Sequence, residues 1–173
     1  MGYMFYNSGV PSVSLGKSWK VKDMNRMFNE SQVEKVEIED TSNVTTMINM
    51  FNNANKLKEW NFSDWDTSKV TTMRAMFYST RALQSPVHFK DVSNVEDMNR
   101  MFNNSNVPSV ILGKSWKVKD MSLMFEDSQV EKVEIEDTSS VTTMDKMFSN
   151  ASKLKEWNFS DWDTSKVTTM RAM

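Results

Sequence analysis

The chain has 173 residues, with 21 Lys and Arg against 23 Asp and Glu, and a formal net charge of −2. This balance excludes a strongly basic nucleic-acid binder and an acidic tail. The absence of Cys and the presence of a single His exclude disulfide scaffolds, thiolate metal sites, Cys nucleophiles and imidazole clusters. No apolar run approaches the roughly 20 residues of a membrane span, and Met1 is not followed by a signal-peptide pattern.

A repeat of 97 residues organises the chain. Residues 10–24 return at 107–121 with one change, and residues 56–76 return unchanged at 153–173. Inside each block a Met-Phe pair recurs every 23 to 26 residues, which divides the chain into about seven units. A fixed period of this length predicts a solenoid. We therefore expect residues 1–173 to form a single repeat domain in which block 10–106 is repeated from residue 107.

Each unit opens with an apolar-x-x-apolar-x-apolar pattern. Its last three residues alternate between apolar and polar, which predicts a short strand with one face turned inward. Stacked units would join these strands into one parallel sheet. The expected strands span residues 10–15, 33–38, 57–62, 83–89, 107–112, 130–135 and 154–159.

A second pattern, Val-x-x-Met-x-x-Met-Phe, follows each strand. Offsets of 0, 3, 6 and 7 place four apolar side chains on one face of about two helical turns. Asp-Thr-Ser precedes the pattern at residues 40–42, 66–68, 137–139 and 163–165, and its oxygens can cap a helix start. The sequence thus predicts an α/β solenoid in which each coil contains a strand and a short capped helix.

The unit at residues 57–77 carries the core Trp-Asp-Thr-Ser-x-Val-Thr-x-Met-x-x-Met-Phe. This core resembles the bacterial surface-protein repeat of mycoplasma-type lipoproteins and BspA-like leucine-rich-repeat proteins, and the resemblance covers nearly the whole chain. It implies a leucine-rich-repeat-like right-handed coil. It also implies a cell-surface or secreted binding scaffold that catalyses no known reaction.

Two features could suggest metal sites. Asp64-Trp-Asp-Thr-Ser68 places oxygens at positions 1, 3 and 5, as calcium loops do, but Lys69 stands where such a loop needs Gly and Ala75 where it needs Glu. We therefore interpret these side chains as helix caps. The Met stripe could suggest a soft metal ion, but its register with Val and Phe predicts a packed core.

The Trp and Phe residues fall into two groups. Trp60 and Phe62, with their copies 97 residues later, occupy strand positions that should face inward. Trp65 and its copy lie in the loops after the strands, where we expect them to be buried. For Trp19 and Trp116 both burial and exposure in a contact site remain open.

The outward positions of the strands form the candidate binding face, because the sheet faces of solenoids commonly bind ligands. This face is polar and mildly acidic, so a solvated face without a ligand is the alternative. Its candidate ligand-binding residues are Lys35, Glu37, Glu39, Glu59, Asn61, His88, Lys90, Lys132, Glu134, Glu136, Glu156 and Asn158.

The repeat presents the same groups at regular intervals rather than unlike groups gathered in one pocket, so we expect no enzyme activity and no cofactor or metal. Two functional hypotheses remain. One is a module for adhesion to a host or matrix protein or glycan, and the other is a structural spacer or antigenically variable repeat. Neither nucleic acid nor a membrane span is expected. The chain starts and stops inside a repeat, which suggests a fragment of a longer array whose ends associate end to end.

Overall fold

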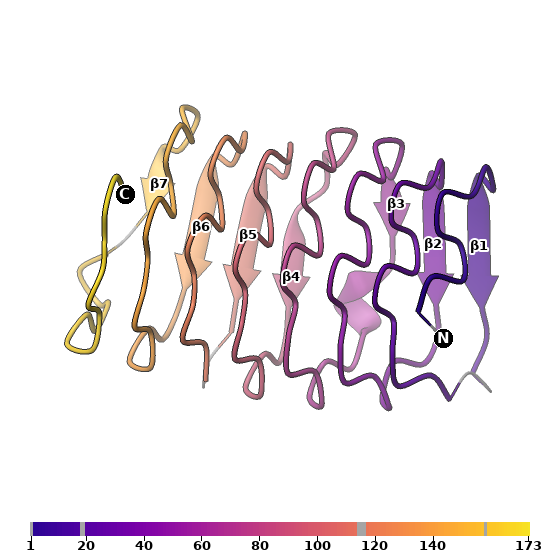
Figure 1. Ribbon diagram of the computed structural model, residues 1–173, viewed down its shortest axis with the longest axis horizontal. Coiled ribbons are helices and arrows are strands. Elements are labelled where there is room, and N and C mark those ends of the chain that lie inside the picture. Colours follow the sequence, from indigo (N-terminus) through magenta and orange to yellow (C-terminus); the bar gives the residue numbers. More distant parts are fainter. Residues whose placement is uncertain (1, 18–19, 114–116, 158) are drawn as a thin grey trace.

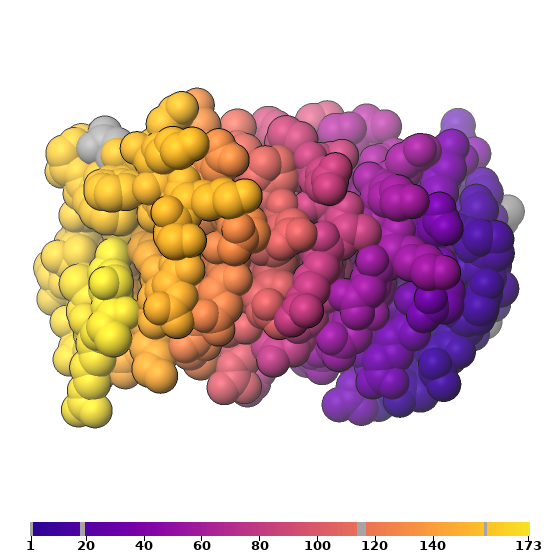
Figure 2. Space-filling model, turned by 90° about the horizontal axis from the view of Figure 1, so that it is seen from above, coloured from indigo at the N-terminus to yellow at the C-terminus, as the bar shows by residue number. Residues whose placement is uncertain are grey.

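The computed structural model describes residues 2–17, 20–113, 117–157 and 159–173. The strands follow one another in chain order along an elongated solenoid whose two termini lie at opposite ends (Figures 1 and 2). No helix in these ranges is long and apolar enough to cross a membrane. The strands are β1 (Ser12–Leu15), β2 (Lys35–Ile38), β3 (Glu59–Trp60), β4 (Val87–Phe89), β5 (Ser109–Leu112), β6 (Lys132–Ile135) and β7 (Glu156–Trp157).

All seven strands lie within the expected segments, and every pair of hydrogen-bonded strands is parallel. The pairing is in register from coil to coil: Val13 lies beside Val36, and Val36 beside Trp60. Equivalent side chains therefore form columns along the solenoid. The strands are two to four residues long, shorter than expected. The first apolar residue of each pattern lies in the loop before the strand, and β3 and β7 also end two residues early.

The expected single sheet is divided in two. Strands β1–β2–β3 form one sheet and β4–β5–β6–β7 the other. After the two-residue β3 the chain turns into the 3-10 helix η1 (Phe62–Asp64), which packs against β4. The irregular unit at residues 78–101 therefore joins the two sheets by side-chain packing and by loop hydrogen bonds, such as that from the Met73 N–H to the Asp97 carbonyl (3.0 Å).

The expected helical segments are replaced by paired turns. The Met27 N–H donates to the Met24 carbonyl (3.2 Å), and both Arg26 and Glu30 have positive φ, at 54° and 58°. The Phe28 N–H instead donates to the Met50 carbonyl of the next coil (2.8 Å). An α-helix keeps its N–H groups within its own segment. Bonding from coil to coil is therefore incompatible with the α-helix that the spacing suggested, and η1 is the sole helix of the described ranges.

The turns bury the same side chains that the helix was expected to bury. Val44, Met47, Met50 and Phe51 are all 0% exposed, which confirms the Met stripe as core. Successive Phe rings stack with centroid separations of 5.2 to 5.6 Å and interplanar angles of 1° to 7°. The column runs through one continuous core and consists of Phe5, Phe28, Phe51, Phe77, Phe102, Phe125 and Phe148.

The Asp-Thr-Ser segments form the expected local hydrogen bonds, but a turn follows each one instead of a helix. Asp40 Oδ1 accepts the Ser42 N–H (2.9 Å) and the Ser42 hydroxyl (2.7 Å). The Thr41 hydroxyl donates to the Asp66 carbonyl of the next coil (3.1 Å). The motif therefore ties neighbouring coils together as well as closing its own turn.

The identical segments 56–76 and 153–173 lie in two environments. Trp60 is half-buried and Phe62 is 3% exposed, because Phe77 and β4 pack over them. No described coil lies over the second copy, where Trp157 is 52% and Phe159 is 37% exposed. Trp157 is nevertheless the register partner of the buried Val133, and Phe159 packs against Phe148 and Trp162, so both side chains lie on the expected inward side of an uncovered coil.

Candidate functional site

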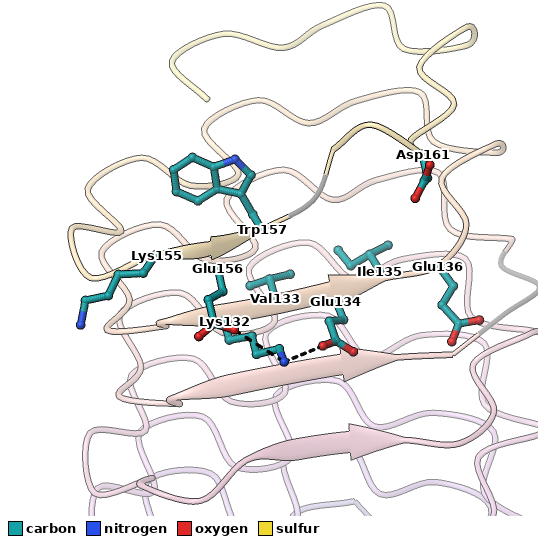
Figure 3. A pocket seen from close by; sticks show the side chains of 9 residues that line it. All are labelled: Lys132, Val133, Glu134, Ile135, Glu136, Lys155, Glu156, Trp157 and Asp161. Atoms are coloured by element: carbon teal, nitrogen blue, oxygen red, sulfur yellow. Dashed lines mark ion pairs between the residues drawn. The ribbon is translucent and has the colours of Figure 1, made fainter.

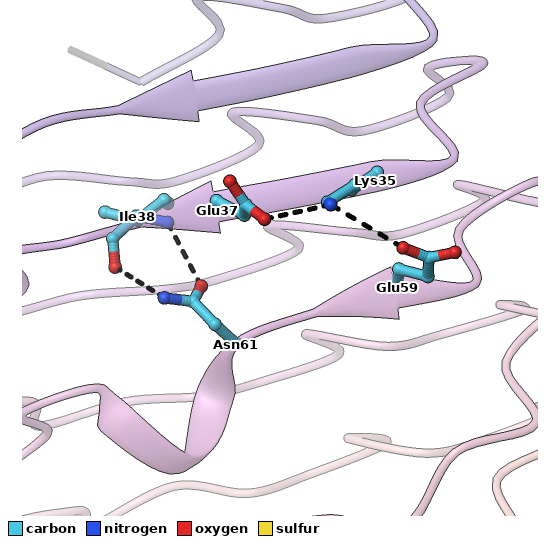
Figure 4. A network of polar contacts seen from close by, with 5 residues as sticks. All are labelled: Lys35, Glu37, Ile38, Glu59 and Asn61. Atoms are coloured by element: carbon cyan, nitrogen blue, oxygen red, sulfur yellow. Dashed lines mark hydrogen bonds and ion pairs between the residues drawn. The ribbon is translucent and has the colours of Figure 1, made fainter.

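Outward side chains of β2 and β3 form a network of ion pairs (Figure 4). Lys35 and Glu37 lie two residues apart on one strand and therefore share a face, and Glu59 is the register partner of Lys35 on β3. The Lys35 ammonium lies 3.0 Å from Glu37 Oε1 and 3.8 Å from Glu59 Oε2. One cation thus links two neighbouring strands on the solvent side.

The same network recurs 97 residues later, on β6 and β7 (Figure 3). Lys132 lies 2.8 Å from Glu134 Oε1 and 3.6 Å from Glu156 Oε2. A second pair flanks each network, with Lys58 3.3 Å from Glu34 and Lys155 3.6 Å from Glu131. The duplicated sequence therefore produces a duplicated surface.

The network raises the pKa of both lysines. A hydrogen bond to Glu37, together with the negative charges of Glu37 and Glu59, raises the pKa of Lys35 above its ordinary value. Glu134 and Glu156 raise the pKa of Lys132 in the same way. Both lysines carry their charge at neutral pH, as an unshifted lysine also does, and each lies beside two carboxylates.

A cavity of about 710 Å³ lies beside the second network. Polar side chains line one part of it and the exposed indole of Trp157 another (Figure 3). At the first network the equivalent Trp60 is half-buried, with the ring of Phe77 from the same coil 5.5 Å away, centroid to centroid. The lining residues are Lys132, Val133, Glu134, Ile135, Glu136, Lys155, Glu156, Trp157 and Asp161.

Asn61 extends the strand pairing beyond the end of β3. Its Oδ1 accepts the Ile38 N–H (3.1 Å) and its Nδ2 donates to the Ile38 carbonyl (3.2 Å), so the side-chain amide replaces a peptide group of the sheet (Figure 4). The Trp65 indole N–H also donates to Oδ1 (3.3 Å). The amide atoms of Asn61, which we expected to contact a ligand, therefore make hydrogen bonds within the fold instead. The copy of this residue, Asn158, lies outside the described residues.

The other predicted residues are distributed along the solenoid. Glu39 and Glu136 are exposed at the ends of their strands, beside the two networks. His88 is exposed on β4 with Ile111 as its register partner, and Lys90 follows it. The structure therefore brings Glu37 and Glu59 together with Lys35, and Glu134 and Glu156 together with Lys132. It places His88 and Lys90 apart from both networks.

The predicted burial of the loop tryptophans can be compared with the structure for Trp65 and Trp162. Trp65 is 4% exposed and packs 4.2 Å from Phe62, centroid to centroid, as expected. Its copy Trp162 is half-buried. Trp19 and Trp116 lie outside the described residues. Sequence reasoning passed over Tyr3 and Tyr6, which are exposed at the turns, because the turn conformation that gathers their neighbours was not anticipated.

Two aspartates give opposite contributions to the pH dependence of stability. Hydrogen bonds from the Ser42 hydroxyl and N–H lower the pKa of Asp40, so its stabilising effect is present above the unfolded pKa and is lost as pH falls through the folded pKa. Burial raises the pKa of Asp97. Its contribution is therefore most favourable at low pH and declines as pH rises through the folded pKa.

We expect Asp97→Asn to melt at or a few degrees above the parent at pH 7, because the amide keeps the acceptor for the Asn99 N–H (2.9 Å) without the half-buried charge. The difference should disappear below about pH 3.8, where an unfolded Asp is protonated. Asp40→Asn is the matched control and should melt below the parent at pH 7. Thermal scans from pH 3 to 8 measure both. Equal changes in melting temperature, in the same direction for both variants, would contradict the opposite contributions assigned to Asp40 and Asp97.

The chain matches a family described as "Mycoplasma protein of unknown function, DUF285" over residues 1–116 and again over residues 112–173. Comparisons with curated proteins and with solved structures give no significant match. Together the two matched segments cover both 97-residue blocks, including both ion-pair networks. The chain therefore belongs to the DUF285 family, a Mycoplasma family of unknown function.

Proposed function

We propose that the chain is a non-enzymatic binding module that attaches to a host or matrix protein or glycan through its outward strand face. The observation that supports this function is the duplicated Lys–Glu network. The two copies are four strands apart, about 19 Å at roughly 4.8 Å per strand, and lie on one solenoid. Two weak sites on one body can raise avidity by about a hundredfold or more when a partner spans them.

The charge of the face favours a basic protein as the partner. Each network contains one Lys and three Glu when Glu39 or Glu136 is included, so negative charge is in excess. Because the pairs are solvent-exposed, with side-chain exposures of 46% for Lys35 and 48% for Glu37, salt should screen them over about 8 Å at physiological ionic strength. Attachment should therefore weaken as salt is added.

The proposal includes a cell-surface or secreted location and a lipoprotein-type or BspA-like leucine-rich-repeat architecture. The sequence core at residues 57–77 and the Mycoplasma description of the family support it. Staining of intact cells with an antibody against the chain, with and without surface proteolysis, tests the location. Staining only after the cells are permeabilised would contradict it.

The binding face is tested by changing Glu37, Glu39, Glu134 and Glu136 together to Gln. Binding to an array of host-surface and matrix proteins and glycans should fall at least tenfold, and the remaining binding should lose its salt dependence. Variants altered in one block alone should keep single-site binding without the avidity gain. A control with four carboxylates neutralised elsewhere, at Glu96, Glu126, Asp127 and Asp145, should bind like the parent.

Unchanged binding and salt dependence in the four-Gln variant, with its circular dichroism intact, would contradict a role for the strand face. Absence of binding by the parent to every member of the array would favour the alternative function, a structural spacer or antigenically variable repeat.

A further inference from the structure

A second cavity, of about 300 Å³, is lined by turn residues of the first three coils, which lie at the N-terminal end of the solenoid (Figure 1). It arises because successive turns stack: the Tyr3 N–H donates to the Asn25 carbonyl (3.0 Å) and the Arg26 N–H to the Ile48 carbonyl (2.9 Å). This stacking places side chains from three coils side by side. The principal residues that line the cavity are Tyr3, Tyr6, Arg26, Glu30, Asn49 and Asn52.

Two exposed aromatic rings form one wall of this cavity. Tyr3 is 52% and Tyr6 is 44% exposed, and their rings meet edge to face at 5.8 Å. Arg26 donates a hydrogen bond to the Tyr3 hydroxyl (2.5 Å), and its guanidinium lies 5.4 Å from the Tyr3 ring centroid. The Tyr6 hydroxyl donates to Glu30 (3.4 Å). Each tyrosine hydroxyl thus has a hydrogen-bond partner on the next coil.

Amides form the rest of the surface. Asn52 Nδ2 donates to Asn49 Oδ1 (3.0 Å), which positions two groups that can both donate and accept hydrogen bonds. Asn29 also lines the cavity at 7% exposure, and its Oδ1 has no hydrogen-bond partner among the described residues. A ligand hydroxyl that reaches Asn29 Oδ1 would donate the hydrogen bond that this atom lacks.

The combination selects for a neutral, hydroxyl-rich ligand. One Arg and one Glu balance each other, so neither an anion nor a cation is favoured. Aromatic faces pack against the C–H faces of sugar rings, while amides bond to sugar hydroxyls. A volume of about 300 Å³ is at the small end of ligand sites, which run from about 300 to 1,000 Å³.

The fold does not require these residues. Ninety-seven residues later the core positions Phe5, Met27, Phe28, Met50 and Phe51 recur as Phe102, Met124, Phe125, Met147 and Phe148. The principal lining residues, in contrast, are all replaced. The corresponding residues there are Arg100, Asn103, Leu123, Asp127, Lys146 and Ser149.

We propose that the cavity between Tyr3, Tyr6 and the Asn49–Asn52 pair binds a neutral monosaccharide unit of a glycan. The site is on the turn side, away from the strand face of the proposed function, and does not depend on it. Binding of one sugar ring to a shallow site should be weak, with dissociation constants in the millimolar range, and should be nearly independent of salt.

Saturation-transfer NMR with the methyl glycosides of glucose, galactose, mannose and N-acetylglucosamine tests the proposal on the 173-residue chain. At least one glycoside should bind, and Tyr3→Ala/Tyr6→Ala should weaken its affinity at least tenfold with the circular dichroism unchanged. Arg26→Ala should weaken it less, because both rings remain. Tyr78→Ala is the matched control: Tyr78 occupies the turn position of Tyr6 but has Ala75 where the first coil has Tyr3, so the affinity should not change.

Two results would overturn the site: no transfer to any of the four glycosides, or an affinity that the double Tyr variant leaves unchanged. Binding that disappears in the four-Gln variant of the strand face but persists in the double Tyr variant would assign sugar binding to the other surface. Loss of protein adhesion in the four-Gln variant with sugar binding retained would support the turn-side site independently.

Discussion

Phe62→Ala should lower the free energy of unfolding by about 3–5 kcal/mol, whereas Phe159→Ala should lower it by less than about 2 kcal/mol. The two residues lie in identical segments, 56–76 and 153–173, so differences in local propensity and in the unfolded chain nearly cancel. Their burial differs: Phe62 is 3% exposed and Phe159 is 37% exposed.

The packing around the two rings explains the expected difference. Phe62 lies 4.6 Å from Trp60, 5.3 Å from Phe77 and 6.1 Å from Phe89, centroid to centroid, besides its contact with Trp65. Its removal leaves a cavity that Phe77 of the same coil and Phe89 of the next coil enclose. At Phe159 no described coil closes the outer side, so solvent fills the space.

Urea unfolding followed by circular dichroism measures both losses on the 173-residue chain. Phe62→Leu is the conservative control and should lose much less than Phe62→Ala, because it fills most of the volume. Equal losses for the two Ala variants would contradict the different environments of the two copies, and with them the packing of residues 78–101 over the first copy.

The strands could be predicted because their signal is local and repeated. Alternation at Val36 and Ile38, recurring at Val133 and Ile135, is compatible only with one face inward, and the structure buries all four. Strand length was less predictable. It depends on where neighbouring coils stop pairing, and at β3 that point is set by Asn61, whose side chain replaces a peptide group.

The helices were predicted wrongly because an apolar spacing of 0, 3, 6 and 7 fits two conformations. A helix and a pair of tight turns both direct these side chains inward. The distinguishing feature is positive φ between them, which Asn tolerates better than most residues. Asn49, Asn53, Asn104 and Asn150 all have positive φ, between 53° and 59°. Asn at these positions was the available signal, but Arg26 and Ala75 at equivalent places obscured it.

The two candidate sites also differ in how far the sequence alone could predict them. The Lys35 and Lys132 networks were predictable as a face, since alternation alone places Lys35 and Glu37 on one side of a strand. The turn-side cavity was not. Tyr3, Arg26 and Asn49 are 23 residues apart in sequence, so stacking of the coils aligns them, but which of their neighbours join them depends on the paired-turn conformation.

Met50→Asp should destabilise the chain by about 3 kcal/mol or more, since it places an unpaired charge in the core. Met50 is 0% exposed and lies in the interior column with Met27 and Met76, which are also 0% exposed. The carboxylate would have no cation beside it within this apolar column. At about 2–4 °C per kcal/mol for a domain of this size, the melting temperature should fall by at least about 6 °C.

Two control variants distinguish the effect of burying a charge from the effect of replacing a methionine. Met50→Leu keeps the volume and should cost less than about 1.5 kcal/mol. Met173→Asp makes the same chemical change at the equivalent position of the last coil, where the side chain is 38% exposed, so hydration should keep its cost well below that of Met50→Asp. If Met50→Asp melted within a few degrees of the parent, or no lower than Met173→Asp, the Met column could not be the core that holds successive turns together. The coil-to-coil hydrogen bonds alone would then have to account for the stacking.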